Sequence, residues 1–464
     1  MELTDNQLRM LDELVSIPSW YSDDEKYFPD RPDEQKLLNR IAQYFEGTDC
    51  IPWRLLCDVR YLRHLVGKSD RKEVYAEAIR PSHSFPQHLD EARNSAVKLL
   101  KSFGLQNAEL SMENRQVGKR ESLIVEKGDG TEFTVMLYAH IDTVPPEKGW
   151  ENPYDKLGRY DMKAGVMTII EIMKTIKVAK GMKLIAAFCP DEERNSAGAM
   201  SLLQWPGLIN VDVIFSPEIA TLKGQREEDH PKDVITNRVG HAKFLTKTTV
   251  PQGHLYTKNL PEAEAADVEI RNHMLSTFYQ NPRTHPYFGD MTEELKCRGG
   301  RVVNSAGFSN TVESSRRWSQ IILPPNSIKA ALQTQFGVIS QLADMRQWTQ
   351  QKIGFSVVPD LSETSYDPYT VNVHTDVAQA VLEGVAEHYG GYKLKGGAST
   401  SDGNVFVPWF IQQGKDVPMF EVGAMGGGAH SMEEYVLNSS IAKNIAWYRY
   451  MIEQKLPHFF ARRK

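Results

Sequence analysis

The sequence predicts an α/β protein: a mixed, mostly parallel sheet with helices on both faces, and a smaller α+β domain inserted into that fold. Three observations support this class. From about residue 86, short β-rich segments alternate with amphipathic helices, which is the pattern of a largely parallel sheet. The alternation stops after Glu218 and returns near residue 376. The chain has 464 residues, enough for two or three domains that each bury a core.

The elements are expected in the following order. Leu8, Leu11 and Leu14 recur at helical spacing and predict a helix from Asp5 to Val15. A short helix is expected at residues 60–64, and a longer one at 90–104 that ends at Gly104. Beyond these, strands are predicted at 122–127, 133–139, 182–189 and 211–216, and helices at 162–177, 195–205, 376–391 and 440–455.

The interruption of the pattern places the domain boundaries. Residues 1–228 and 369–464 are expected to form the two segments of the main domain, and residues 229–368 the inserted domain. Within the first segment, residues 20–85 have no clear periodicity and are expected to be additional material.

Composition excludes several classes of protein. Lys and Arg total 54 against 60 Asp and Glu, a net charge of −6, whereas nucleic-acid binders usually carry a basic surplus. No stretch of eighteen apolar residues predicts a membrane span, and the acidic amphipathic N-terminus does not resemble a signal peptide. The four cysteines are scattered without a CxxC pair, so we expect a cytoplasmic protein without a disulfide framework or a thiolate metal site.

The first group of residues with chemical potential is Tyr138-Ala-His140-Ile-Asp142, at the end of a predicted strand. Residues two apart in a strand point the same way, so His140 and Asp142 share a face. A neutral imidazole can bind a metal ion while a carboxylate holds its other ring nitrogen. The alternative is a core histidine beside a surface aspartate.

The second group is Asp191-Glu192-Glu193, directly after the strand predicted at 182–189. Of two adjacent carboxylates, one can bind a metal ion while the other takes a proton from water. The alternative is an acidic helix N-terminus, which the helix dipole favours.

The third group is the glycine-rich segment 426–435, in which His430 follows three glycines and an alanine. Glycines let the backbone approach a ligand closely. A phosphate-binding loop is disfavoured because no Gly-Lys-Ser/Thr follows. The alternative is a flexible turn beside an ordinary histidine.

Two further carboxylates complete the set. Asp161 opens the helix predicted at 162–177, and Glu218 follows the strand at 211–216. The alternatives are a helix N-cap for Asp161 and an exposed loop position for Glu218. Taken together, two histidines and three carboxylates, with Glu192 to spare, suit zinc, cobalt or manganese. A carboxylate-bridged pair of such ions, roughly 3.5–4 Å apart, suits hydrolysis.

These motifs resemble the zinc-dependent exopeptidases and deacylases that include glutamate carboxypeptidase, aminoacylase, acetylornithine deacetylase and succinyl-diaminopimelate desuccinylase. The resemblance covers residues 86–464. It is carried by YAHIDTVPP with Trp150 and Asn152-Pro-Tyr after it, DMKAG, PDEERNSAGA, TSDGNVF and VPMFEVGAMGGGAHSMEEYV. The last two segments look closest to the glutamate-carboxypeptidase branch. The resemblance implies a zinc-exopeptidase-like catalytic domain with an inserted lid that mediates a homodimer.

The resemblance also implies residue roles. His140 and His430 would each bind one of two divalent ions, Zn²⁺ with Co²⁺ or Mn²⁺ as alternatives, and Asp161 would bridge them. Glu193 would be a further ligand, Glu192 the general base and acid, and Asp142 the residue that orients His140. Glu218 would supply the last carboxylate, although strict alignment on Pro217 would place Ser216 there instead. His254 in the lid, with His241 as its rival, would reach the substrate.

The chain departs from the family pattern at two places. The loop before Asp161 is shortened, and the lid segment ILPPNSIKAALQTQF lacks the arginine that grips the substrate carboxylate in this family. Arg316, Arg317 and Arg346 are candidates to replace it.

The reaction expected from this resemblance is hydrolysis of an amide bond next to a free carboxylate, in a small peptide or N-acyl amino acid. The alternatives are a deacylase of N-acetyl or N-succinyl amino acids, and a pseudoenzyme that uses this fold as a binding or scaffold protein.

Overall fold

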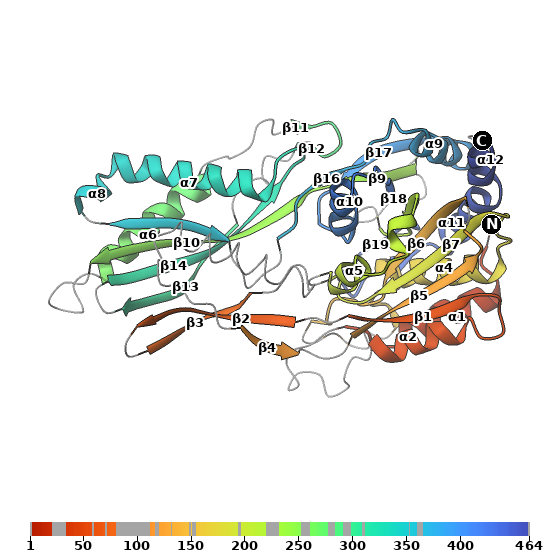
Figure 1. The fold of residues 1–464 in the computed structure, drawn as a ribbon, viewed down its shortest axis with the longest axis horizontal. Coiled ribbons are helices and arrows are strands. Elements are labelled where there is room, and N and C mark those ends of the chain that lie inside the picture. The colour runs from red at the N-terminus through yellow and green to blue at the C-terminus, as the bar shows by residue number, and fades with distance from the viewer. Residues whose placement is uncertain are drawn as a thin grey trace. The chain divides into compact units, whose positions relative to one another are not determined.

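The computed structural model describes most of the chain: residues 2–20, 34–57, 60–69, 72–79, 112–116, 120–130, 132–147, 150, 155–193, 196–219, 232–251, 260–276, 284–290, 298–308, 311–351, 353–359 and 365–462. The chain divides into two compact units (Figure 1). Unit 1 comprises Met1–Asp58, Gly118–Asn237 and Thr370–Lys464, and unit 2 comprises Val59–Val117 and Arg238–Tyr369. Residues 59–117 thus group with unit 2, whereas the sequence placed them in the first segment of the main domain. The domain boundaries inferred from sequence stay a prediction.

Unit 1 is built on a nine-stranded sheet. Its strands follow one another in the order β1 (Ile51–Cys57), β5 (Arg120–Gly128), β7 (Met182–Cys189), β6 (Phe133–His140), β8 (Val213–Ser216), β18 (Met419–Glu421), β9 (Lys232–Arg238) and β16 (Tyr369–Thr370), with β17 (Tyr392–Gly397) also paired to β9.

The centre of this sheet is parallel and its flanks are antiparallel. Strands β7, β6, β8 and β18 run parallel to one another, whereas β5 pairs antiparallel with β1 and β7, and β9 pairs antiparallel with β18. All eight residues of β6 are buried, as expected for a parallel strand covered on both faces. The predicted α/β class, with a mixed and mostly parallel central sheet, is therefore confirmed.

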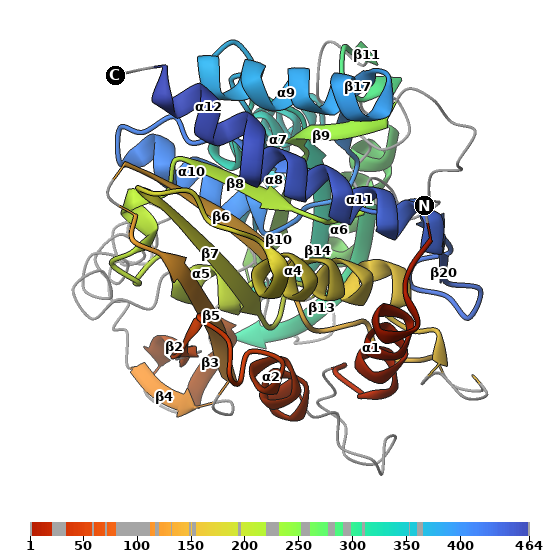
Figure 2. The ribbon, with the colours of Figure 1, turned by 90° about the vertical axis from the view of Figure 1, so that its right-hand side faces the viewer.

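Helices cover both faces of the sheet. Figure 2 shows α4 (Ala164–Thr175), α9 (Asp376–Tyr389) and α11 (Asn438–Tyr450) in front of the strands, and α5 (Ala197–Leu202) and α10 (Gly403–Gln412) behind them. Helix α4 contacts β6 and β7 on one side and α1 (Asp5–Ser16) and α11 on the other. It is buried nearly all round because apolar residues occupy most of its surface, which fits its place between two layers. The remaining helical segments of unit 1 are α2 (Glu34–Gln43), η2 (Arg159–Lys163), η3 (Leu208–Asn210), η4 (Met451–Lys455) and α12 (Leu456–Ala461).

The prediction of a helix at residues 60–64 is wrong. These residues belong to strand β2 (Arg60–Ser69), which pairs antiparallel with β3 (Lys72–Ile79) and β4 (Met112–Gln116). The helix predicted at 90–104 lies outside the described residues. The N-terminal helix is confirmed as α1, with a capping box between Thr4 and Gln7 at its start.

Unit 2 contains a four-stranded antiparallel sheet in the order β13 (Arg298–Phe308), β14 (Thr311–Ile322), β10 (Gly240–Pro251) and β15 (Gly354–Pro359). Helices α6 (Leu260–Ser276) and α7 (Ile328–Met345) pack on one face, where Phe244 and Trp318 are buried between sheet and helices. The described part of this unit also holds the three-stranded sheet β3-β2-β4 and the short elements α8 (Trp348–Gln351), β11 (Thr284–His285) and β12 (Gly289–Asp290).

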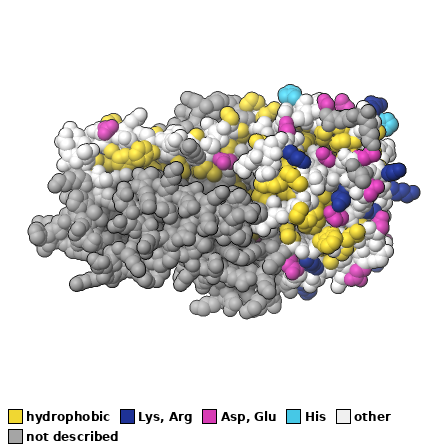
Figure 3. All heavy atoms as spheres, viewed as in Figure 1, with side chains coloured by type: hydrophobic (Ala, Val, Ile, Leu, Met, Phe, Trp, Pro, Cys, Tyr) yellow, Lys and Arg dark blue, Asp and Glu magenta, His cyan; other side chains and the backbone are white. Residues whose placement is uncertain are grey.

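The surface of the described residues mixes charges of both signs. On the face shown in Figure 3, Lys and Arg side chains are interspersed with Asp and Glu over unit 1, as expected from the near balance of 54 basic and 60 acidic residues. No helix among the described residues has the length and apolar character needed to cross a membrane.

Candidate metal centre

The candidate site lies where the four parallel strands of unit 1 end. Strand β6 ends at His140, β7 leads into Asp191-Glu192-Glu193, and β8 leads to Glu218. Strand β18 leads into the hairpin of β19 (Gly426–Gly427) and β20 (Tyr435–Val436), whose turn carries His430. Carboxyl ends of adjacent parallel strands share one edge of a sheet, which is where open α/β folds place their sites.

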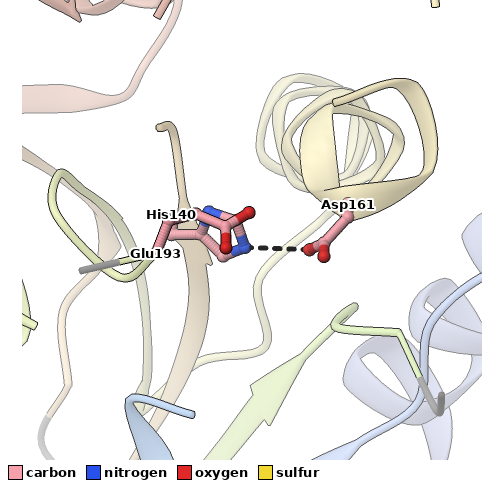
Figure 4. Close-up of side chains that lie close together, drawn as sticks. All are labelled: His140, Asp161 and Glu193. Carbon is pink, nitrogen blue, oxygen red and sulfur yellow. Dashed lines mark hydrogen bonds and ion pairs between the residues drawn. The ribbon is translucent and has the colours of Figure 1, made fainter. Parts of the chain in front are cut away.

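His140 is 1% exposed and points into this site. Its Nδ1 lies 3.0 Å from the backbone carbonyl oxygen of Asp142. A neutral imidazole that donates its Nδ1–H to this oxygen has a lone pair on Nε2. That Nε2 lies 3.2 Å from Oδ1 of Asp161 and 3.4 Å from Oε2 of Glu218. Figure 4 shows His140, Asp161 and Glu193 close together, with the contact from His140 to Asp161 drawn. The His140 ring is thus fixed on one side and faces carboxylates on the other.

Asp161 lies between the two imidazoles. Its Oδ1 contacts Nε2 of His140, and its Oδ2 lies 3.1 Å from Nε2 of His430. The residue occurs in the segment η2, before α4 begins, where its own backbone is not helical (φ −114°, ψ 92°), and no side chain caps the start of either element. The N-cap alternative for Asp161 is therefore wrong. Burial opposes ionisation of this carboxyl, but the hydrogen bonds from His140 and His430 outweigh it and lower its pKa well below the usual range.

Glu193 reaches the same place from the turn after β7. Both of its carboxylate oxygens lie close to Nε2 of His430, at 3.2 and 3.1 Å. His430 has a left-handed backbone (φ 62°) in the turn of the hairpin. Burial disfavours the charged imidazolium, but the hydrogen bonds that it donates to the carboxylates of Asp161 and Glu193 raise the pKa of His430 to about 10. Burial together with the charge of Asp161 raises the pKa of Glu193 to about 7.

Glu218 is 7% exposed, so the exposed-loop alternative is wrong. Its Oε1 accepts a hydrogen bond from the backbone N–H of Ile219 at 2.9 Å, and its Oε2 faces His140. Ser216, the rival for this ligand position, donates its hydroxyl to the carbonyl oxygen of Tyr138 at 3.1 Å. Glu218 thus presents a carboxylate oxygen to His140, whereas the Ser216 hydroxyl is bonded to the backbone.

The donor set fits divalent ions. One ligand atom each from His140, Asp161 and Glu193 lies within 4.8 Å of the others, and His430 and Glu218 contact this group. Two imidazole nitrogens and several carboxylates without thiolate suit zinc, cobalt or manganese. The carboxylates outnumber the imidazoles in a buried space, and such an excess of negative charge is costly unless cations neutralise it.

The carboxylate of Asp142 supports the acidic turn. Its Oδ1 accepts the backbone N–H of Glu192 and its Oδ2 accepts that of Glu193, both at 3.1 Å. Oδ1 lies 3.6 Å from Nδ1 of His140, so the closer contact with the imidazole is made by the Asp142 carbonyl. Asp142 thus holds His140 through its backbone and the Glu192-Glu193 turn through its side chain.

Glu192 lies beside this cluster. Burial raises its pKa well above the ordinary value, the charge of His140 opposes the shift, and the carboxylates of Asp402 and Glu193 add to it. A raised pKa suits a group that must both accept and donate a proton near neutral pH.

Two buried carboxylates of the site were missed from the sequence. Asp402, at the start of α10, accepts a hydrogen bond from the hydroxyl of Tyr138. Glu434, in the His430 hairpin, accepts three backbone N–H groups of the turn that carries Asp161. Both lie in segments that resemble the family, but no local pattern distinguishes either from a surface acid.

The predicted residues of the inserted domain lie in unit 2. His254 lies outside the described residues, and His241 is in β10, where its backbone pairs with Tyr366. Of the candidate arginines, Arg316 forms an ion pair with the buried Asp267 at 2.6 Å, and Arg346 forms one with Glu269 at 3.2 Å. Arg317 is adjacent to Arg316 in β14 and therefore lies on the opposite face of the sheet.

Imidazoles and carboxylates gathered at the carboxyl edge of an α/β sheet fit a metal-dependent hydrolase. Residues 136–454 match the model of peptidase family M20/M25/M40, well over half of the chain. The chain belongs to this family, and the family resemblance noted in the sequence is confirmed.

Individual relatives are distant. The acetylornithine deacetylase of Buchnera aphidicola subsp. Acyrthosiphon pisum (strain 5A) is 24% identical over 241 residues, which are 47% of this chain and 58% of that protein. The chain thus matches little more than half the length of this relative.

Solved structures show the same fold. The di-peptidase Dug1p from Saccharomyces cerevisiae superposes with a TM-score of 0.59 at 10% identity, over 98% of this chain and 96% of that one. The YXEP protein of Bacillus subtilis, a dinuclear metal-binding peptidase of the M20 family, gives 0.54 at 12% identity, over 96% of each chain. At these identities the likeness concerns the fold alone.

Proposed function

We propose that this chain is a dinuclear metal-dependent hydrolase that cleaves an amide bond next to a free carboxylate, in a small peptide or N-acyl amino acid. One observation carries the proposal: the two oxygens of Asp161 face Nε2 of His140 and Nε2 of His430 at 3.2 and 3.1 Å. A carboxylate between two imidazoles can bridge two ions. His140 with Glu218 would hold one ion, and His430 with Glu193 the other. The donor set favours Zn²⁺, with Co²⁺ or Mn²⁺ as alternatives.

Bound divalent ions would polarise the scissile carbonyl and lower the pKa of water from 15.7 towards about 7. The residues of the chain do the rest. Glu192, with its raised pKa, takes a proton from the attacking water on its carboxylate and returns it to the leaving amine. The carboxylate of Asp142 holds the Glu192-Glu193 turn next to Asp161 by accepting the backbone N–H groups of both glutamates.

Substrate recognition is proposed to involve unit 2. Arg316, Arg317 and Arg346 are our candidates for the substrate carboxylate; Arg316 also pairs with Asp267 and Arg346 with Glu269. His254 is our candidate to stabilise the oxyanion, acting across a homodimer formed through this unit. The dipeptidase activity named for Dug1p supports a small peptide as substrate.

A deacylase is the second candidate function. It is supported by the match of 241 residues to acetylornithine deacetylase. The same metal ligands and general base would serve, with a different pocket for the acyl group. Hydrolysis of dipeptides and acyl-glutamates compared with that of N-acetyl and N-succinyl amino acids separates the two.

The test of the shared mechanism is Glu192→Gln in the metal-loaded chain. Turnover should fall by at least the 10²–10⁴-fold that a general base contributes, while the metal content stays near two ions per chain. Asp129→Asn, at an exposed position of unit 1, is the control. Wild-type turnover in Glu192→Gln would refute the assignment. A wild-type chain that binds two ions but hydrolyses neither substrate class would instead support the pseudoenzyme alternative.

A further inference from the structure

The hairpin that carries His430 also carries a buried carboxylate with an unusual set of partners. Glu434 is 3% exposed and directly precedes β20. Its Oε1 accepts the backbone N–H groups of Tyr160 at 2.7 Å and of Asp161 at 2.9 Å, and its Oε2 accepts that of Gly158 at 3.0 Å. A buried carboxylate is costly without donors, and here both of its oxygens are satisfied by the backbone of a single turn.

This turn is the one that presents Asp161. Gly158 has a left-handed backbone (φ 75°), and a Cβ there would lie 2.3 Å from Cγ2 of Thr143, so the turn has no room to shift on that side. Farther along the turn, the buried ammonium of Lys163 donates to the carbonyl oxygen of Ile17 at 2.8 Å, after the end of α1. The backbone at Asp161 is thus held by Glu434, while its side chain is free to face the two imidazoles.

We propose that Glu434 is a positioning residue that sets Asp161 between His140 and His430 before a metal ion arrives. The proposal rests on the proposed function, because it requires that Asp161 bridge two ions. Glu434 is four residues after His430 in the same hairpin, so one side chain fixes the bridging carboxylate to the segment that bears the second imidazole. Hydrogen-bond partners of this kind orient metal ligands, and their loss typically weakens metal binding by about 10- to 100-fold.

Glu434→Gln is the central variant because it keeps the shape of the side chain. Its amide oxygen can still accept from Tyr160 and Asp161, but its NH₂ group would face the N–H of Gly158. Glu434→Ala removes all three hydrogen bonds. The neighbouring Glu433 is exposed, so Glu433→Gln is a matched control that removes the same charge from the same hairpin.

The experiment uses Co²⁺ as a spectroscopic probe in the full chain. Metal-free wild type and variants are titrated with Co²⁺ while the visible absorption is recorded, and unfolding midpoints are measured in parallel. Hydrogen exchange of the peptide spanning 158–162 is measured on the metal-free chains. We expect Glu434→Gln to bind Co²⁺ about 10- to 100-fold more weakly, with an altered absorption spectrum at saturation and faster exchange at 158–162. Glu434→Ala should be weaker still, and Glu433→Gln should match wild type.

The outcomes are distinguishable. Wild-type Co²⁺ affinity and spectrum in Glu434→Gln would overturn the positioning role and leave the proposed function standing. A lowered unfolding midpoint with a wild-type spectrum at saturating Co²⁺ would show a purely structural role and would also overturn it. If the wild-type chain itself bound no Co²⁺, the proposed metal centre would fall and the positioning role with it. Should Glu434→Ala fail to fold, Glu434→Gln alone decides.

Discussion

Asp142→Asn tests how the acidic turn is held. Asp142 is 3% exposed, and its two carboxylate oxygens accept the N–H groups of Glu192 and Glu193, each at 3.1 Å. Asparagine keeps one acceptor, but its NH₂ group would face the other N–H. The substitution therefore removes one charge-assisted hydrogen bond and makes the second one neutral.

The magnitude follows from these contacts. A hydrogen bond to a charged group contributes about 1.5–3 kcal/mol and a neutral one about 1 kcal/mol. Losing one and weakening the other therefore costs the turn about 2–5 kcal/mol. If this energy holds Glu192 in its reactive place, turnover should fall by about 30- to 5000-fold, since about 1.36 kcal/mol corresponds to a factor of ten.

The assay is steady-state hydrolysis at saturating substrate and metal, with metal content measured on the same samples. Asp129→Asn removes a charge from an exposed position of the same unit and should leave turnover unchanged. The His140 ring keeps its hydrogen bond to the Asp142 carbonyl in the variant, so we expect two ions to bind at saturation. Turnover within threefold of wild type in fully metal-loaded Asp142→Asn would refute the reasoning.

Three further predictions follow from other contacts of unit 1. Gly423→Ala would place a Cβ 2.2 Å from the carbonyl oxygen of Glu218. We therefore expect the variant to be less stable by about 1–3 kcal/mol and to bind metal more weakly. Unfolding curves and metal titrations that match those of the wild type would contradict this. Burial lowers the pKa of Lys232 from 10.5 to about 8, although the charge of Asp233 opposes this shift. Between these two pH values the unfolded chain binds more protons than the folded chain. The free energy of unfolding should therefore rise with pH across this window, by up to about 3 kcal/mol. Urea unfolding at pH 7.5 and 10 should show this rise in wild type and its loss in Lys232→Met; an equal rise in both would contradict it. Chelation should lower the unfolding midpoint, because ions at about 1,000 times their Kd stabilise by about 4 kcal/mol, and an unchanged midpoint would rule out specific binding.

The convergence of the site was predictable because sheet topology does most of the positioning. His140, Glu193 and Glu218 each lie at or after the end of a strand that the sequence predicts from its apolar residues. Parallel strands bring their carboxyl ends to one edge of the sheet. His430 lies in the hairpin that follows β18, whereas Asp161 lies in a non-helical segment before α4 and was found through chemistry and resemblance rather than through a strand. For all five, the contacts with one another are observed, whereas their roles stay proposals.

The errors and omissions have physical causes. Leu62 and Leu65 in strand β2 are three residues apart, a helix-like spacing, but pairing with β3 and β4 decides the conformation of this segment. Glu433 and Glu434 are identical in sequence terms, yet one is exposed and the other buried, because the Asp161 turn packs against the hairpin at only one of them. Asp402 meets Tyr138 across 264 residues, a contact that no local pattern encodes.

The shortened loop before Asp161 and the missing lid arginine are the two sequence features that favour a pseudoenzyme, and the contacts of Asp161 bear on the first of them. A shorter connection would impair the site if it pulled Asp161 away from the imidazoles. In the structure, Glu434 holds the backbone of this turn and Lys163 ties it to Ile17, while the Asp161 carboxylate contacts both His140 and His430. The Asp161 carboxylate therefore reaches both imidazoles despite the shorter connection. A panel of dipeptides, acyl-glutamates and N-acyl amino acids is the measurement that separates the peptidase from the deacylase.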